Sequence, residues 1–302
     1  MTAAVESYIA LRRSLGFKLV RVARWLKDFA AFAIARGSSH LRTADAIDWA
    51  GRSASPYQRS CRLKVVAAFA RHLRAEDSRH EVLPANHFRF KRQRRTPTLY
   101  TLEDTGRLIA AARRLGPRGS LRPHVYATLF GLLACTGLRL GEALRLRFAD
   151  LSPDGLLIHH TKFNKTRLVP LHKTAAAALS VYLVRRRRVA ALTDHLFVSL
   201  AGRQIQPGKV DHVFLALARS ISLRAGPGTR GVRLHDFRHT FAVRSLEACS
   251  SDRERVGRHL VALSTYLGHA DVSDTYWYLT ATPQLFRSIA SACEAIFPGG
   301  AS

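Results

Sequence analysis

The sequence predicts a mostly helical protein of two domains, with a small β-sheet or hairpin in the second domain. Three observations predict this fold: apolar residues at helical spacing up to about residue 80, a basic stretch after them, and short β-like runs near residues 154 to 170. At 302 residues the chain can bury two cores of ordinary size. We expect domains at 1–86 and 101–302, joined by a linker at 87–100.

The first domain reads as a small helical bundle. Trp25, Phe29 and Phe32 fall at i, i+4 and i+7, and Gly37 follows where such a helix would stop. Thr43 is the expected N-cap of the next helix. Ser55, followed by proline, opens a further helix with one apolar stripe. The stripe consists of Leu63, Val66, Phe69 and Leu73.

The segment 87–100 reads as a basic linker. It holds five Lys or Arg between Arg89 and Arg95, has no apolar periodicity, and is broken by Pro97. A basic linker between two basic domains suggests a clamp around a polyanion, and a solvated charge run is the alternative.

The second domain opens with a capping box, because Thr101 is followed three residues later by Asp104. HVYATLFGLLACTG then predicts a buried helix, and DGLLIHH, TKFNK and TRLVPL predict two β-runs around a polar turn. Helices resume at Thr174, and the four arginines 185–188 read as a helix C-terminus, where positive charge is favoured.

The charge of the chain predicts a polyanionic partner. Lys and Arg outnumber Asp and Glu 48 to 21, which gives a formal charge of +27. Nucleic acid is the favoured partner, although ribosomal, chromatin and membrane-surface proteins share this excess. The polar faces of the first domain could bind phosphates or form a solvated coat. They carry Arg12, Arg13, Lys18, Arg59, Arg62 and Lys64.

Cysteine usage and hydropathy predict a soluble protein of a reducing cytoplasm. The four cysteines are scattered and form no CxxC pair, which argues against a zinc cluster or a disulfide framework. No apolar run reaches membrane-spanning length, and the start lacks the pattern of a secretory signal. We expect no membrane partner.

Four segments concentrate polar, reactive side chains: TGLRLGEALRL, TKFNKTRLVPL, LHDFRHTFA and YLGHADVSDTYWYL. Each has an ordinary explanation on its own. Arg139 and Glu142 could form an i, i+3 ion pair, Lys162 could be a turn lysine, and His269 could cap a helix. His235 and Arg238, three apart where a helix is expected to begin, would point toward the same spot.

Taken together and in this order, the segments resemble the catalytic domain of the tyrosine recombinases of the phage-integrase and Xer type. The family pattern is an Arg in TGLR-x-x-E, a hairpin Lys, H-x-x-R, L-G-H, and a tyrosine nine residues after that His. This chain has TGLRLGE, TKFNKTRLVPL, HDFRH, LGH and Tyr278. The resemblance spans about residues 101–290 and implies a tyrosine-recombinase architecture, in which 1–86 is a core-binding DNA-binding domain and 101–302 a mixed α+β catalytic domain with a C-terminal helix.

The resemblance implies a DNA strand transferase that forms a 3′-phosphotyrosine intermediate. A phosphodiester under attack develops negative charge on its non-bridging oxygens, which suits the forked guanidiniums of Arg139 and Arg238. His235 could bind the same phosphate or accept the tyrosine proton, and both roles stay open. His269 would be a further phosphate donor.

The nucleophile implied by the family spacing is Tyr278, with Tyr276 as its rival. Lys162 aligns with the hairpin lysine of the family and would protonate the departing 5′ oxygen, while Lys165 in the same turn would contact backbone phosphate. Glu142 could fix Arg139 before substrate arrives, or could form an exposed ion pair of under about 1 kcal/mol.

No cofactor or metal is expected. The covalent intermediate keeps the energy of the broken phosphodiester, so religation needs neither ATP nor metal, and the chain lacks a GxxxxGK[ST] loop. His235 and Asp236 spell an HD pair, but no further carboxylate and histidine set at suitable spacing accompanies it.

Beyond the nucleophile, the tail predicts an apolar helical stripe, which could pack on its own domain or dock into a neighbouring subunit. It consists of Leu285, Phe286, Ile289, Cys293, Ile296 and Phe297. The resemblance implies that double-stranded DNA is the substrate. It also implies a tetramer, of this chain or with a related recombinase, that assembles on two DNA sites in the nucleoid.

Two alternative functions remain at this stage: a type IB topoisomerase-like enzyme that relaxes one duplex, and a DNA-binding relative without catalysis. Integration, transposition and multimer resolution all use the same chemistry. The stretch TYWYLTATPQL, where many relatives have a tyrosine followed by Thr-His, favours a recombinase of a mobile element.

Overall fold

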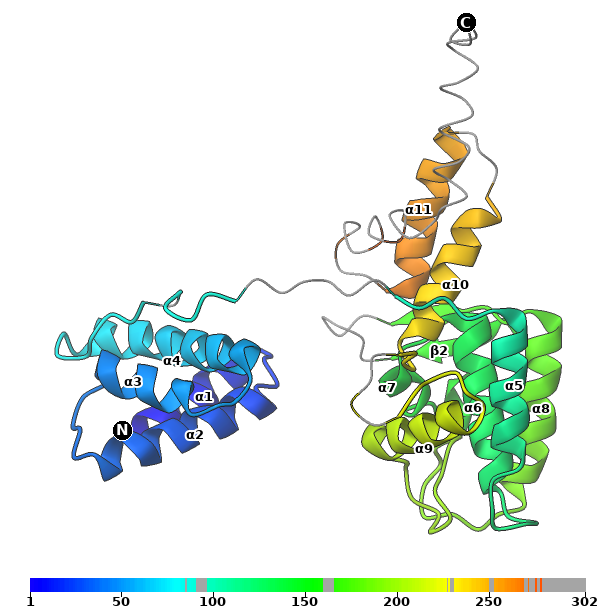
Figure 1. Cartoon of the computed structure of the whole chain (residues 1–302), viewed down its shortest axis with the longest axis horizontal. Coiled ribbons are helices and arrows are strands. Elements are labelled where there is room, and N and C mark those ends of the chain that lie inside the picture. The colour runs from blue at the N-terminus through cyan, green and yellow to red at the C-terminus, as the bar shows by residue number, and fades with distance from the viewer. Residues whose placement is uncertain are drawn as a thin grey trace, which may run out of the picture. The chain divides into compact units, whose positions relative to one another are not determined.

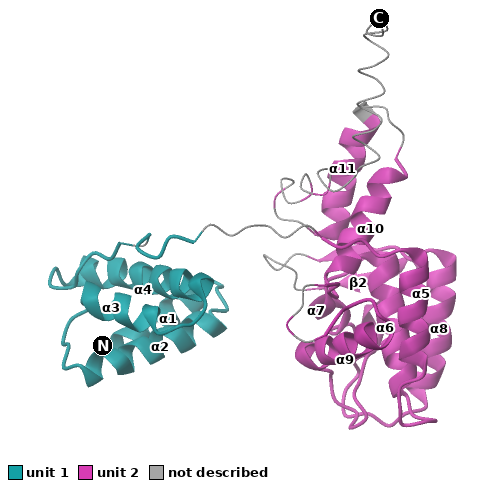
Figure 2. Cartoon of the chain, in the orientation of Figure 1, with its two compact units in different colours: residues 1–95 teal, residues 96–302 magenta. Residues whose placement is uncertain are grey.

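The chain forms two units, residues 1–95 and 96–302, so the division falls inside the predicted linker (Figure 2). The computed structural model describes residues 1–84, 86–90, 97–159, 166–226, 228, 231–249, 253–268, 271, 275 and 278, with backbone only at 253 and 254. Both units are mainly helical and the second holds a small antiparallel sheet, as the sequence predicts. None of the described helices has the length and apolar character needed to cross a bilayer.

The described residues of the first unit form a bundle of four helices around one apolar core (Figure 1). The helices are α1 (Thr2–Ser14), α2 (Val20–Ala35), α3 (Thr43–Gly51) and α4 (Pro56–Glu76). The stripe predicted on α4 is buried, with Leu63, Val66 and Phe69 all fully enclosed. Gly37 adopts a left-handed φ of +73° just after α2, as its predicted role in stopping that helix requires.

The predicted cap of α3 is wrong by one residue. Arg42 is the N-cap, without a side-chain cap, and Thr43 is the first helical residue. The amide of Thr43 instead donates to Glu81 Oε2 at 2.7 Å, so a carboxylate 38 residues away does what a local hydroxyl was expected to do. The caps at Ser55, which accepts from Gln58 N, and at Thr101 are confirmed.

Helices make up most of the described residues of the second unit. They are α5 (Leu102–Arg113), α6 (Arg122–Thr136), α7 (Leu140–Ala143), the 3₁₀ helix η1 (Phe148–Asp150), α8 (Lys173–Arg187), α9 (Pro207–Ser220), α10 (Asp236–Glu247) and α11 (Arg253–Leu267). Helix α6 is the predicted apolar helix; it packs against α5, α8 and α10, and Phe130 lies fully buried at its centre. Helices α10 and α11 lie side by side (Figure 1).

The sheet of the second unit has the order β1-β2-β3, all antiparallel. Its strands are β1 (Leu151–Ser152), β2 (Gly155–Ile158) and β3 (Arg167–Val169). Strands β2 and β3 confirm the two predicted β-runs, with Leu156 opposite Val169, while β1 was not predicted. The turn between β2 and β3, residues 160–165, lies outside the described residues.

The four-arginine run at 185–188 ends α8 as predicted, but its members differ. Arg186 is 3% exposed and its guanidinium donates to the carbonyls of Thr193 and His195, at 2.8 to 3.1 Å. This arginine ties the loop after α8 to its helix, a role that a charge count does not indicate.

Gly155→Ala should destabilise the second unit. Gly155 has φ +142°, and a Cβ there would lie 2.3 Å from the carbonyl oxygen of Val169. Left-handed strain and this backbone overlap should cost about 1–3 kcal/mol of unfolding free energy, measured by denaturant titration. Gly106→Ala is the matched control, because its Cβ meets nothing within 4 Å on α5 and alanine favours a helix. Equal effects of the two changes would contradict the account.

Candidate active site

Arg139 is the N-cap of helix α7, and a single carboxylate holds this arginine. Gly137 ends α6 with φ +61°, which turns the chain toward α7. Glu142, one helical step on, accepts from the Arg139 backbone amide at 3.0 Å and from Arg139 Nη1 at 2.9 Å. Glu142 is only 4% exposed, so the exposed ion pair considered from the sequence is not what forms. The carboxylate fixes the guanidinium in the absence of substrate.

A second arginine, Arg167 of β3, shares the same carboxylate. Its Nη2 and Nη1 donate to the two Glu142 oxygens at 2.9 and 3.2 Å, and its Nε donates to the carbonyl of Tyr266 at 2.8 Å. Burial alone would raise the pKa of Glu142, but the hydrogen bonds and charges of Arg167 and Arg139 outweigh it and lower the pKa to about 2. Two guanidiniums around one carboxylate leave the site net positive.

Arg238 meets Arg139 at the carboxyl end of α11. Arg238 is 2% exposed, and it donates from Nη1 to Gly137 O at 2.9 Å and from Nη2 to Leu267 O at 2.6 Å. Arg139 donates to the same Leu267 carbonyl at 3.5 Å and to Gly268 O at 3.2 Å. The carbonyls at a helix C-terminus carry partial negative charge, which favours both cations there.

His235 is the N-cap of α10, one helical step before Arg238. Burial, followed by the charges of Arg238 and Arg233, lowers the pKa of His235, so the imidazole is neutral at pH 7. A neutral imidazole can accept a proton or hydrogen-bond an anion. The adjacent Asp236 is fully buried and holds Arg233 at 2.6 Å, so the carboxylate of the HD dipeptide is engaged in an ion pair.

Tyr278 packs on the same helix. It is 3% exposed, belongs to an apolar cluster with α10 and α11, and its ring lies 5.5 Å from the ring of His239. Burial, followed by the charge of Arg139, lowers the pKa of Arg238 to about 10, and the negative charge that Tyr278 would carry on ionisation acts in the opposite direction.

Four of the six predicted catalytic residues, Arg139, His235, Arg238 and Tyr278, thus gather around α10 and the end of α11. The other two, Lys162 and His269, lie outside the described residues. So do Lys165, Tyr276 and the apolar stripe predicted beyond residue 284.

Two residues of this cluster, Arg167 and His239, were missed from the sequence. Strand alternation contains the signal for Arg167, because it lies on the same face of β3 as the buried Val169, and an arginine at a core-facing position needs a partner. His239 lies four residues after His235 and therefore on the same face of α10.

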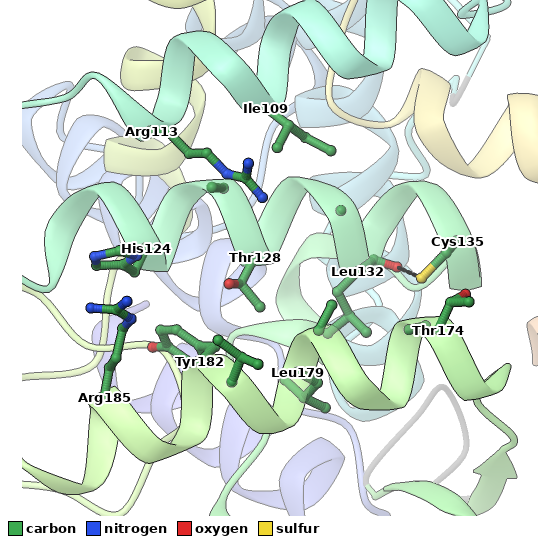
Figure 3. A pocket seen from close by; sticks show the side chains of 15 residues that line it. Ile109, Arg113, His124, Thr128, Leu132, Cys135, Thr174, Leu179, Tyr182 and Arg185 are labelled. Atoms are coloured by element: carbon green, nitrogen blue, oxygen red, sulfur yellow. Dashed lines mark hydrogen bonds between the residues drawn. The ribbon is translucent and has the colours of Figure 1, made fainter.

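A separate groove of about 490 Å³ between α5, α6 and α8 contains none of the predicted catalytic residues. Arg113, His124 and Arg185 lie at one end of it, and Cys135 and Thr174 at the other (Figure 3). Burial, with the charges of Arg185 and Arg113, lowers the pKa of His124. The groove is distinct from the cluster around α10.

The chain is similar to known proteins over most of its length. The model of the phage integrase family matches residues 101–284. A protein of Sinorhizobium fredii named as an integrase/recombinase, y4rB, is 44% identical, covering 94% of each chain. The tyrosine recombinase XerD of Rhizobium meliloti is 31% identical, covering 91% of this chain and 88% of its own.

Among solved structures, a lambda integrase tetramer bound to a Holliday junction has a TM-score of 0.61 and 16% identity. The match covers 89% of this chain and 77% of that one, and at this identity it shows the shared fold. The chain belongs to the phage integrase family of tyrosine recombinases, and it is a site-specific recombinase that cleaves and rejoins DNA strands.

Proposed function

We propose that Arg139 and Arg238 bind the scissile phosphate of DNA, with His235 beside them. The observation that carries the proposal is that both guanidiniums donate to the Leu267 carbonyl. A guanidinium has five N–H donors, so each arginine keeps N–H groups that these contacts do not use. Two forked cations stabilise the charge that develops on non-bridging oxygens during attack. The electrostatics are already arranged without substrate, which lowers the reorganisation needed for reaction.

In the proposed reaction the Tyr278 oxygen attacks the phosphorus, and the bond from phosphorus to the 5′ oxygen breaks. The phenolic proton goes to a base, for which the neutral His235 is one candidate, and the departing 5′ oxygen takes a proton from Lys162. The product is a 3′-phosphotyrosine. Attack by a 5′ hydroxyl of another strand reverses these transfers and releases Tyr278. His269 adds a hydrogen bond to the phosphate.

Glu142 and Arg167 have a positioning role in this proposal. Glu142 holds Arg139, and Arg167 joins the carboxylate to β3, the strand that follows the turn containing Lys162. The ion pairs would therefore fix the arginine clamp relative to the turn that supplies the general acid. A buried carboxylate shared by two guanidiniums is expected to be rigid, because moving either guanidinium away would leave a buried charge without its partner.

DNA is the partner, and the first unit is the proposed core-binding domain that grips it. Of the six basic residues predicted to face phosphates, Arg13, Lys18 and Lys64 are exposed. Arg12 and Arg62 instead stack on Phe17 and Trp49, at 4.1 and 4.9 Å. We propose that the three exposed residues contact DNA phosphates.

Recombination is proposed to require a tetramer, of this chain or with a related recombinase, held together by the C-terminal helix. The lambda integrase tetramer on a Holliday junction is a precedent for such an assembly in a protein of the same fold. Integration or transposition of a mobile element is the proposed setting. Supercoil relaxation by a monomer without site preference would favour the topoisomerase alternative.

Tyr278→Phe should abolish the covalent adduct. Wild-type protein on a nicked duplex carrying its recombination site, identified by sequencing DNA trapped on the protein, should give an adduct stable to denaturing electrophoresis. The Phe variant lacks the attacking oxygen but should bind the duplex as before. Tyr276→Phe is the matched control and should form the adduct. The assignment fails when these two outcomes are reversed.

Arg139→Lys should impair cleavage more than binding. Lysine keeps the charge but lacks the fork that pairs with Glu142 and with phosphate, so the single-turnover cleavage rate constant should fall by about 10²- to 10³-fold. The Kd for the duplex should change by less than about threefold, because many other phosphate contacts remain. Equal losses in duplex affinity and in the cleavage rate constant would contradict a role of Arg139 in stabilising the transition state.

Glu142→Gln should lower stability at neutral pH, and the difference from wild type should vanish in acid. The pKa of Glu142 is lowered in the folded protein from 4.5 to about 2. Its contribution to stability is therefore present above pH 4.5 and lost as the pH falls toward 2. The full contribution is about 3 kcal/mol.

The measurement is denaturant unfolding across that pH range. Asp194→Asn is the control, because Asp194 forms an ion pair with Arg147 in which both side chains are more than half exposed. This control should change stability little at any pH. A pH-independent difference between wild type and Glu142→Gln would contradict the linkage.

A further inference from the structure

The ring of His239, on α10, contacts the rings of His235 and Tyr278. His239 is one helical turn after His235 and 8% exposed. Its ring meets the ring of His235 edge-on, with centroids 4.7 Å apart at 86°, and meets the ring of Tyr278 at 5.5 Å and 58°. One imidazole therefore contacts both a proposed phosphate ligand and the proposed nucleophile.

The helix segment that carries His239 is held on both sides of it. Arg238, the preceding residue, donates to Gly137 O and Leu267 O. Thr240, the following residue, donates to Asp236 O and accepts from the amide of Tyr100. The residues on both sides of His239 are consequently held, and its ring packs against the phenol.

The phenol also belongs to an apolar cluster. Leu263 and Leu267 of α11 belong to the same buried cluster as Tyr278, together with residues of α10. Such a cluster limits motion but offers no directional contact, whereas the imidazole ring meets the phenol at a defined tilt. Loss of the His239 ring would open space on one side of Tyr278 and let the phenol shift.

We infer that His239 is a positioning residue for the nucleophile. Its ring sets the distance and tilt at which the Tyr278 oxygen approaches a phosphate bound by Arg238 and His235. The inference rests on the proposed function of Tyr278 and adds a residue to which the family pattern gives no role. A displacement of about 1 Å at the attacking atom is enough to lower a rate constant by up to about 100-fold.

The test is single-turnover cleavage of the nicked duplex by four variants. His239→Ala removes the ring, His239→Asn keeps a polar group without a ring, and His239→Phe keeps a ring without nitrogen. Ala and Asn should each lower the cleavage rate constant about 10- to 100-fold, and Phe should recover most of the loss. His212→Ala, at an exposed histidine of α9, should behave as wild type.

Asn recovering while Phe does not would assign the effect to a hydrogen bond and overturn the inference. Equal rate constants for His239→Ala and wild type would overturn it as well. Melting temperature and duplex Kd are measured for each variant. If the Ala variant does not fold, the rate constants of the Phe variant and wild type still test whether a ring without nitrogen is sufficient. An adduct formed by Tyr278→Phe would instead overturn the proposed function.

A second substrate separates nucleophile positioning from leaving-group chemistry. In a duplex with sulfur at the 5′ bridging position, the thiolate departs without needing a proton. The ratio of wild-type to His239→Ala rate constants should be the same on this duplex as on the oxygen substrate. A ratio that falls toward one would show that His239 acts on the leaving group, and the positioning role would be wrong.

Discussion

The buried carboxylate of Glu142 is the constraint on which the rest of the site depends. It joins α7, through Arg139, to β3, through Arg167, and Arg167 and Arg139 both reach the carboxyl end of α11. Three elements far apart in the sequence are thereby fixed around one point. Removing the carboxylate would leave two guanidiniums facing each other, with partial desolvation of both. The positive charge of the two arginines is thus held in place by one buried negative charge.

Helix α10 is the second fixed part, and the start of the second unit is tied to it. The ring of Tyr100 stacks on Phe237 at 4.4 Å, its hydroxyl donates to Arg233 O, and its carbonyl accepts from Arg244. Phe237 and Arg244 are on α10, and Arg233 precedes the helix. The start of the second unit is therefore anchored directly to the helix that carries Arg238 and His239.

The two arginines reach their common point by different means. Arg139 is the N-cap of a helix of only four residues and stays partly exposed. Arg238 is within a longer helix and almost fully enclosed. Burial is costly for a cation and is compensated here by two carbonyls, one at each of two helix ends. Arg139 is thus held mainly by a carboxylate, and Arg238 by backbone carbonyls.

The sequence by itself determined the helical bundle, the two β-runs, the caps at Ser55 and Thr101, and the recombinase motifs, because these depend on residues close in the chain. Only the tertiary structure decided which partners meet. Glu81 replaced the expected cap at Thr43, Arg186 turned out to be buried, and Arg167 joined Glu142 from 25 residues away. Periodicity gives the face on which a side chain lies, whereas its partner depends on how distant elements pack, and that is where Arg167 and His239 acquire their contacts.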